Sequence, residues 1–126
     1  MNKLAVKVSM NLIGVTNLKK AKQFYEQVFN MKFIEFRPPF AEATLGNAVF
    51  NIEEHTSYRE KNWAKKHIGG RKSCVFQTNN LQQFLKRAIQ AKAKIIQKPI
   101  TRHWGWQDAV IADFDGNEFA IEQEIK

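Results

Sequence analysis

The residues best suited to nucleophilic or metal chemistry are few in this chain, and they lie far apart. A single cysteine, Cys74, excludes an internal disulfide and a cysteine-based zinc cluster. It lies in the apolar strand pattern at 73–76, with no histidine near it in the sequence, so we predict a buried, inert thiol. The three histidines, His55, His67 and His103, fall in segments that resemble loops or strand ends.

Two predicted helices match each other along the chain. Asn17 is predicted to cap the first helix and Asn80 the second. Apolar residues follow each cap at helical spacing: Leu18, Ala21, Phe24, Tyr25, Val28 and Phe29, then Leu81, Phe84, Leu85, Ala88 and Ile89. Because Leu18 and Leu81 are 63 residues apart, half of the 126-residue chain, the sequence indicates an internal repeat.

Predicted strands complete the repeat. Strands at 6–15 and 74–78 precede the helices, and the tight-turn pairs Gly46-Asn47 and Gly116-Asn117 introduce the last strand of each half. Two further strands lie between helix and last strand in each half: 33–37 and 41–45, then 94–98 and 106–112. The matching order argues against an unrelated α+β sandwich whose halves agree by chance.

The organisation is therefore βαβββ twice within a single domain at 1–126. The first module is predicted at 1–53, a linker at 54–71 and the second module at 72–126. We expect the linker to form a short exposed helix.

These residues resemble one known group of proteins. With Asn17-Leu18 and Phe24-Tyr25 in the first half, and Trp104-Gly105-Trp106 and Asp113-Phe114-Asp115-Gly116-Asn117 in the second, the chain resembles the vicinal oxygen chelate superfamily. That group includes glyoxalase I, extradiol dioxygenases, fosfomycin-resistance enzymes and bleomycin-resistance proteins. The resemblance omits only the linker, and Phe114 replaces the usual proline. It implies an α+β fold in which two modules curl a mixed sheet around a cup, with the helices outside.

The resemblance also implies where a metal would bind. Metal-dependent members place a ligand on the first and last strand of each module, and here those positions are Met10, Asn51, Ser73 and Ala120. A thioether, an amide, a hydroxyl and a methyl group are unsuited to zinc, manganese or iron. A shift of two residues gives Leu12, Val75, Glu53 and Glu122, two carboxylates without a histidine. We therefore predict no metal and no other cofactor.

Without a metal, the resemblance favours the branch typified by bleomycin-resistance proteins, in which the cup binds a flat molecule. Trp104 and Trp106 lie at the hairpin that enters the seventh strand, where family members line the pocket mouth. The predicted ligand-binding residues are Met10, Leu12, Asn51, Ser73, Val75, Trp104, Trp106, Ala120 and Glu122. As alternatives, the tryptophans pack the hairpin or a subunit contact, and Met10 and Leu12 belong to the core.

Net charge limits the classes of ligand that the sequence favours, and the hydrophobic pattern indicates the cellular location. The chain carries 20 basic and 12 acidic residues, a net charge of +8, but the lysines are scattered and no nucleic-acid motif accompanies them. An anionic or neutral aromatic ligand, steered by Arg37, Lys98 and Arg102, suits this charge better than a cationic drug. No apolar run approaches the roughly 20 residues of a membrane span. Since the N-terminus also lacks a signal-peptide pattern, we predict a cytoplasmic protein with no membrane or nucleic-acid partner.

Two function classes stay open. One is a metal-free protein that sequesters an aromatic or anionic ligand or drug. The other is a lyase, isomerase or other enzyme of the same superfamily that uses Glu122 or Glu53 as a base in an apolar cup. We also predict a symmetric homodimer, because the linker is long enough for modules to be exchanged and a partner surface would explain the large ring of Trp63.

Overall fold

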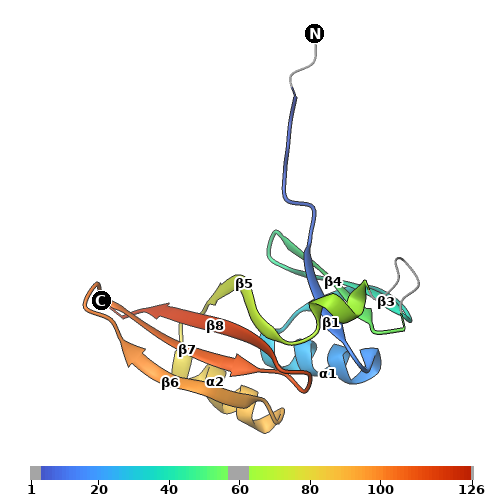
Figure 1. The fold of residues 1–126 in the computed structure, drawn as a ribbon. Coiled ribbons are helices and arrows are strands. Elements are labelled where there is room, and N and C mark those ends of the chain that lie inside the picture. The colour runs from blue at the N-terminus through green and yellow to red at the C-terminus, as the bar shows by residue number, and fades with distance from the viewer. Residues whose placement is uncertain (1–3, 57–62, 126) are drawn as a thin grey trace.

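The computed structural model describes residues 4–56 and 63–125 (Figure 1). It confirms an α+β fold of two βαβββ modules. The first module contains β1 (Asn11–Val15), α1 (Leu18–Phe29), β2 (Lys32–Arg37), β3 (Phe40–Leu45) and β4 (Ala48–Glu54). After a short 3-10 helix, η1 (Ala64–His67), the second contains β5 (Gly70–Gln77), α2 (Leu81–Gln90), β6 (Lys94–Thr101), β7 (Trp106–Ala112) and β8 (Asn117–Glu124).

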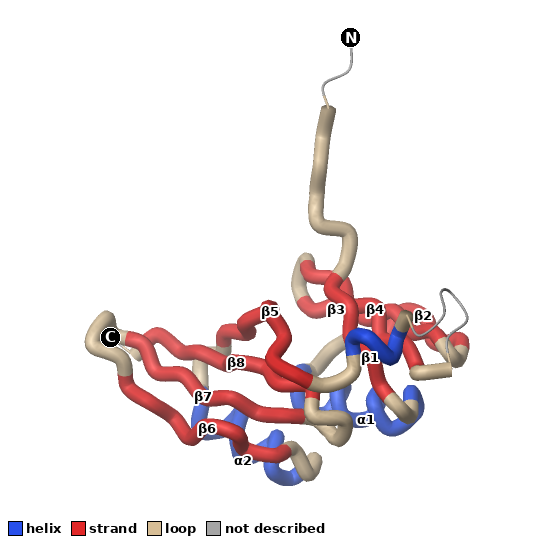
Figure 2. The backbone as a smooth tube through the Cα atoms, viewed as in Figure 1, coloured by secondary structure: helices blue, strands red, loops and turns tan. Residues whose placement is uncertain are grey.

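Each module builds its own four-stranded mixed sheet. The strand orders are β1-β4-β3-β2 and β5-β8-β7-β6, with the first and last strand of each module parallel and the other pairs antiparallel. Both helices lie on the same side of the sheets (Figure 2). Neither helix in the described part of the chain is long and apolar enough to cross a membrane.

Both predicted helix caps are confirmed. The side-chain oxygen of Asn17 accepts the Lys20 backbone N–H at 2.9 Å, and Asn80 does the same for Gln83 at 3.0 Å. A second hydrogen bond is also repeated in the two modules. The Leu18 N–H donates to the Glu54 carboxylate, and the Leu81 N–H donates to the Gln123 side-chain oxygen. The end of the last strand thus satisfies the first amide of the helix in both modules.

The two modules share one hydrophobic core. The ring of Phe29 in α1 lies 4.4 Å, centroid to centroid, from Phe76 in β5, and 5.5 Å from both Phe84 in α2 and Phe119 in β8. Phe50 in β4 stacks on Phe76 at 5.8 Å. Because aromatic rings of both halves interdigitate here, the relative placement of the modules is fixed by packing rather than by strand pairing.

The turn at 113–117, which carries the family-like motif, is the polar part of this module contact. Asp113 accepts the Tyr25 hydroxyl at 2.5 Å and the Asn117 side chain at 2.8 Å. Asn117, fully buried, also donates to the Gly14 carbonyl at 3.0 Å and accepts the Gly69 N–H at 2.7 Å. Burial, followed by the charge of Asp113, raises the pKa of Tyr25 well above its usual value, so the phenol stays a donor.

Two sequence expectations differ from the structure. The first strand was predicted from residue 6, but pairing begins at Asn11. Its parallel partner β4 starts at Ala48, so in this register residues 6–8 have no β4 residue opposite them. The linker helix was expected to be exposed, whereas η1 packs against β1, with Ala64 only 2% exposed. A Cβ on Gly14 would collide with the Ala64 carbonyl oxygen, so this close approach depends on glycine.

Candidate functional site

The strand registers place the predicted site residues on equivalent positions of the two sheets. Leu12 lies opposite Asn51 in the first module, and Val75 lies opposite Ala120 in the second. Their neighbours in the strands, such as Ile13 and Phe76, point into the shared core instead. Since side chains alternate along a strand, the predicted residues lie on the sheet face opposite the helices, which we call the cup face.

The cup face of the first module is closed. Asn51 and Glu53 are 8% and 1% exposed, and the Asn51 amide donates a hydrogen bond to the Glu53 carboxylate. Glu53 lies opposite Gly14, the residue on which η1 packs. The linker therefore packs beside Glu53, the position where the sequence placed a candidate base.

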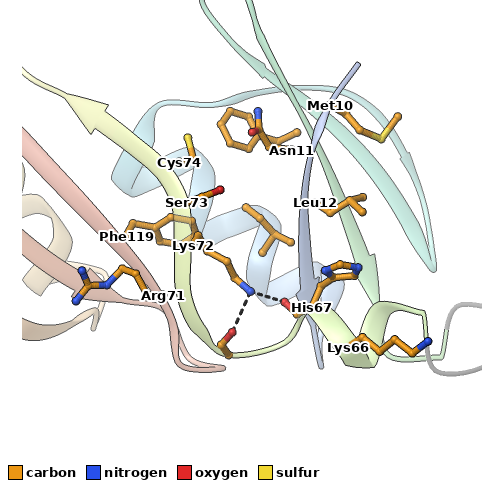
Figure 3. A pocket seen from close by; sticks show the side chains of 13 residues that line it. Met10, Asn11, Leu12, Lys66, His67, Arg71, Lys72, Ser73, Cys74 and Phe119 are labelled. Carbon is orange, nitrogen blue, oxygen red and sulfur yellow. Dashed lines mark hydrogen bonds between the residues drawn. The ribbon is translucent and has the colours of Figure 1, made fainter. Parts of the chain in front are cut away.

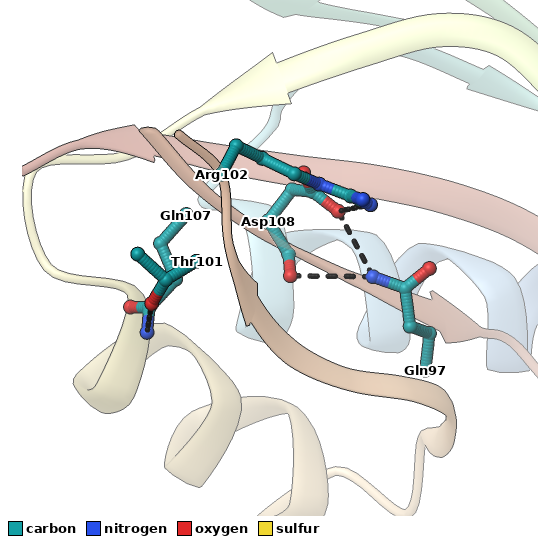
Figure 4. Close-up of polar contacts among 5 residues, drawn as sticks. All are labelled: Gln97, Thr101, Arg102, Gln107 and Asp108. Atoms are coloured by element: carbon teal, nitrogen blue, oxygen red, sulfur yellow. Dashed lines mark hydrogen bonds and ion pairs between the residues drawn. The ribbon is translucent and has the colours of Figure 1, made fainter. Parts of the chain in front are cut away.

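The cup face of the second module is open. Val75 is 54% exposed, and Ala120 and Glu122 beside it are half-buried. Glu122 lies opposite Asp108, whose carboxylate accepts two hydrogen bonds from Arg102, at 2.7 and 3.0 Å, and one from Gln97 at 2.9 Å (Figure 4). The hydrogen bonds from Arg102 hold the pKa of Asp108 below its usual value. This face therefore carries an ionised carboxylate with a bidentate partner.

The two tryptophans lie at the far end of the same sheet. Trp106 is half-buried opposite Glu124, and Trp104 is 58% exposed in the turn before it, with its ring 4.8 Å from that of His103. Neither lines the cavity between β1 and β5. Their contact with a ligand stays a prediction.

A cavity of about 570 Å³ opens between β1 and β5, where the two sheets fail to pair (Figure 3). Three of the predicted ligand-binding residues, Met10, Leu12 and Ser73, line it. Asn11 and Ser73 lie between the two strands, while Met10 and Leu12 lie on the far side of β1 (Figure 3). The remaining lining residues are Asn11, Ile13, Phe50, Lys66, His67, Gly69, Arg71, Lys72, Cys74 and Phe119. None of these lining residues carries a carboxylate.

Lys72 is the most constrained cation of this cavity. Its ammonium reaches from β5 towards β1 and donates to the carbonyl oxygens of His67 at 2.6 Å and Gly69 at 3.0 Å (Figure 3). Burial lowers its pKa, while the charge of Asp113 acts in the opposite direction. Two of its three N–H donors are thus used, and one remains for a ligand.

No pattern in the sequence pointed to Lys72. The register of β5 on β8 shifts between Arg71 and Val75, so Lys72 occupies an irregular stretch that simple alternation does not describe. The residues predicted to steer an anionic ligand, Arg37, Lys98 and Arg102, do not line this cavity. Arg37 pairs with Glu35 on an exposed strand, and Arg102 pairs with Asp108.

The structure therefore divides the predicted ligand-binding residues among separate places. Met10, Leu12 and Ser73 border the cavity between β1 and β5. Asn51 is buried and donates to Glu53, and Trp104 lies on an exposed turn. The other four lie along the open cup face of the second module: Val75, Trp106, Ala120 and Glu122.

The residues at the family's metal positions do not fit a metal ion. Met10, Asn51, Ser73 and Ala120 supply neither an imidazole nor a carboxylate, and Cys74, whose thiol pKa is raised by burial, lies on the core side of β5. Across residues 4–56 and 63–125, no three histidine, cysteine, aspartate or glutamate side chains gather as a metal site would require.

Comparisons with known proteins agree with this architecture. A family model described as the Glyoxalase/Bleomycin resistance protein/Dioxygenase superfamily matches residues 7–121, and the chain belongs to this superfamily. A comparison with curated proteins finds no match.

Several solved structures resemble the chain over nearly its whole length. A glyoxalase/bleomycin resistance protein/dioxygenase family enzyme from Burkholderia phytofirmans PsJN is 25% identical with a TM-score of 0.79, over 93% of this chain and 98% of that one. TioX from Micromonospora sp. ML1 is 15% identical with a TM-score of 0.74, over 94% and 100%. The fosfomycin resistance protein FosX from Mesorhizobium loti is 13% identical with a TM-score of 0.71, over 95% and 93%. The last two likenesses concern the fold alone.

Proposed function

We propose that this chain is a metal-free small-molecule-binding member of its superfamily that sequesters an anionic ligand with an aromatic or apolar body. The observation that carries the proposal is the cavity between β1 and β5. Its walls combine apolar side chains such as Ile13, Phe50 and Phe119 with the ammonium of Lys72, and its lining residues include no carboxylate. A cavity that combines apolar walls with a few polar groups is typical of small-molecule sites.

The charge pattern supports an anion rather than a cation. The whole chain has a net charge of +8, which draws anions towards its surface. Lys66 and Lys72 both border the cavity. Lys72 is held by two carbonyl oxygens, so its charge is already oriented before a ligand arrives. Such preorganisation reduces the entropy that binding costs.

The alternative is an enzyme that uses a cup carboxylate as its base. Glu53 suits this poorly, because it is 1% exposed, beneath η1, and already accepts a hydrogen bond from Asn51. Glu122, on the open face beside Asp108, is the more accessible candidate. Turnover of a bound ligand would favour this class, and release of the unchanged ligand favours sequestration.

Titration calorimetry with 2-naphthoate tests the anion site. We expect the carboxylate to bind, and 2-naphthalenemethanol and 2-naphthylmethylamine to bind at least tenfold more weakly. A charge-assisted hydrogen bond contributes about 1.5 to 3 kcal/mol, so Lys72→Met should weaken binding about 10- to 100-fold, with Lys72→Arg in between.

Lys86→Met serves as the matched control, because Lys86 is an exposed lysine on α2 outside this cavity. Equal affinity for the three naphthalene compounds, or equal losses in the two methionine variants, would contradict the proposed site. Elemental analysis of the purified protein tests the metal-free part, and stoichiometric zinc, nickel, manganese or iron would overturn it.

The proposal also includes a homodimer in the cytoplasm. The ring of Trp63 is half-buried within its own chain and lies 5.2 Å from the ring of His67, so it does not require a partner surface to cover it. Light scattering of the full chain tests this part, with a mass of about one chain, 14.7 kDa, as the contrary result.

A further inference from the structure

A groove on the helix side of the molecule lies apart from the cavity between β1 and β5. Two hollows of about 290 and 330 Å³ meet at Lys20, Phe24 and Phe114, which border both of them. They lie between α1, the C-terminal end of α2 and the turn at 113–117, on the side of the sheets that both helices cover (Figure 2). We call this surface the helix groove and define it by the exposed residues Lys20, Gln23, Gln27, Gln90, Lys92 and Phe114.

The fold brings together cations that are far apart in the sequence. Lys20 lies in the first turn of α1, and Lys92 follows the end of α2. Within residues 4–56 and 63–125, neither ammonium forms an ion pair with a carboxylate. α2 contains no acidic residue, and the acidic residue of α1, Glu26, pairs with Lys22. The groove therefore presents positive charge that its own helices do not neutralise.

Two carboxylates border one end of the groove, and both are already engaged. Asp115 accepts the Thr16 N–H at 3.0 Å and the Thr16 hydroxyl at 2.6 Å. Asp113 is buried and accepts the hydroxyl of Tyr25. The hollow that contains Lys92 has no carboxylate among its lining residues. The groove is therefore suited to an anion at that end.

An aromatic ring is exposed between the two hollows. Phe114 is 54% exposed, and its ring packs edge to face on that of Phe24, with the centroids 5.6 Å apart. This packing orients the ring without covering it. Phe114 replaces the proline that is usual in this turn, so the ring distinguishes this chain from the common motif. An exposed ring of this kind is a surface on which a nucleic-acid base can stack.

Lys92 occupies a backbone position that disfavours a side chain. Its φ of 68° lies in the left-handed region, directly after the C-cap residue of α2, where glycine is usual. The side chain is exposed, so burial does not offset the cost of this conformation. A lysine at this position is explained if its ammonium contacts a ligand.

We propose that the helix groove binds single-stranded nucleic acid, with phosphates at Lys20 and Lys92 and a base stacked on Phe114. A cationic groove with an aromatic platform is the combination that binds single strands without sequence preference. An acidic peptide would match the charge but would not require the exposed ring.

The glutamines of the groove support a nucleic acid as well. The carboxamides of Gln23, Gln27 and Gln90 can each donate to and accept from the edges of unpaired bases. The inference departs from the sequence-based expectation of no nucleic-acid partner, because that expectation rested on lysines scattered along the chain. It is independent of the anion site at Lys72.

Fluorescence anisotropy with labelled twelve-nucleotide oligothymidylate and oligouridylate tests the inference. We expect the single strands to bind, and a duplex of the same length to bind at least tenfold more weakly because its bases are paired. Binding of either strand supports the groove, and the tighter strand identifies the preferred sugar. Phe114→Ala should weaken binding about 5- to 100-fold without changing its salt dependence, whereas Phe114→Leu, which keeps apolar packing on Phe24, should recover little of the loss.

The lysines have a different signature. Lys20→Met combined with Lys92→Met should make the slope of log affinity against log salt shallower by about 1.4, because each phosphate contact with a single strand contributes about 0.7. Lys7→Met combined with Lys65→Met removes the same charge from exposed positions outside the groove and should leave the slope unchanged. Lys92→Gly should raise the melting temperature and still weaken binding, since glycine relieves the left-handed backbone.

Three results of these titrations would overturn the inference. They are the absence of binding by either strand at low salt, equal changes in the two double-methionine variants, and tighter binding of an aspartate-rich dodecapeptide than of either strand. The last result would assign the groove to an acidic protein partner.

Photocross-linking locates the stacked base. An oligothymidylate with one 5-iodouracil is irradiated in complex with the full chain, and mass spectrometry identifies the modified residue. We expect attachment at Phe114. Attachment at Trp104, a ring that is 58% exposed on another part of the surface, would overturn the assignment. Displacement of the strand by 2-naphthoate would place it in the cavity between β1 and β5 and would also overturn it.

Discussion

The two modules have the same frame, down to single hydrogen bonds, but different surfaces. Asn17 and Asn80 cap the helices in the same way, and the first helical amides are held by Glu54 in one module and Gln123 in the other. The cup faces nevertheless differ, since one is closed by η1 and the other is open. The repeat therefore fixes the backbone, and a few substitutions decide what each sheet can contact.

The position four residues before each helix-opening leucine shows how small the deciding change is. Gly14 occupies it in the first module and Gln77 in the second, and they lie opposite Glu53 and Glu122. Without a Cβ at residue 14, η1 can approach and bury Glu53, whereas Gln77 is exposed and Glu122 stays half-buried. One residue type separates an inaccessible carboxylate from an accessible one.

The turns before the last strands differ in a similar way. Asn117 is fully buried and joins Gly14, Gly69 and Asp113, while Asn47, its counterpart, is exposed. We expect Asn117→Ala to destabilise the protein by about 4 kcal/mol, because three buried polar groups lose their partner at once. Asn47→Ala should change stability by no more than about 0.5 kcal/mol. Urea unfolding of both variants measures the difference.

Equal effects of Asn117→Ala and Asn47→Ala would mean that the turn at 113–117 is not the contact that unites the modules. Tyr25→Phe gives an independent check, since it removes only the hydroxyl that donates to Asp113.

The second prediction concerns the closed face. Gly14→Ala should cost about 2 to 3 kcal/mol, because the new methyl group collides with the Ala64 carbonyl and lies 2.9 Å from the His67 backbone, so η1 must move. Gln77→Ala, at the matching position, should be within about 0.5 kcal/mol of the parent chain. Thermal unfolding compares them, and a shift in Trp63 fluorescence in Gly14→Ala alone would report the displaced helix. A harmless Gly14→Ala would contradict the packing of η1.

The smallest expected effect lies on the open face. Asp108 has no counterpart in the first module, where Phe40 lies opposite Glu53. Because Arg102 lowers the folded-state pKa of Asp108, the pair's contribution is present above the unfolded pKa and is lost as the pH falls through the folded pKa. Arg102→Met should raise the Asp108 pKa, as measured by NMR titration, and its stability deficit should shrink on acidification. An unchanged pKa would contradict the bidentate pair.

Features that depend on local spacing could be predicted from the sequence. The caps at Asn17 and Asn80 and the strand at 106–112 agree with the structure because a capping side chain or an alternating strand acts within a few residues. The repeat of 63 residues likewise predicted that Leu12 and Val75 take equivalent places.

Features that depend on the approach of distant segments could not be predicted. The packing of η1 on Gly14 depends on a space that no local pattern reports. The irregular stretch of β5 that aims Lys72 at the cavity depends on β8, some 45 residues later. The length of β1 that can pair depends on its register against β4. Each of these three features decides which side chains are accessible to a ligand. This is why the fold was easier to predict than the site.

The turn at 113–117, in which Asp113 and Asn117 are buried, also bears on how relatives of this chain are recognised. Its polar side chains join the two halves through hydrogen bonds with Tyr25, Gly14 and Thr16. The sequence motif of this turn therefore indicates how the two modules of a chain pack together, and it does not indicate which ligand the chain binds. To compare such chains by activity, one must compare the exposed faces of their strands and the residues that line the cavity between β1 and β5, which here include Lys72 and Ser73.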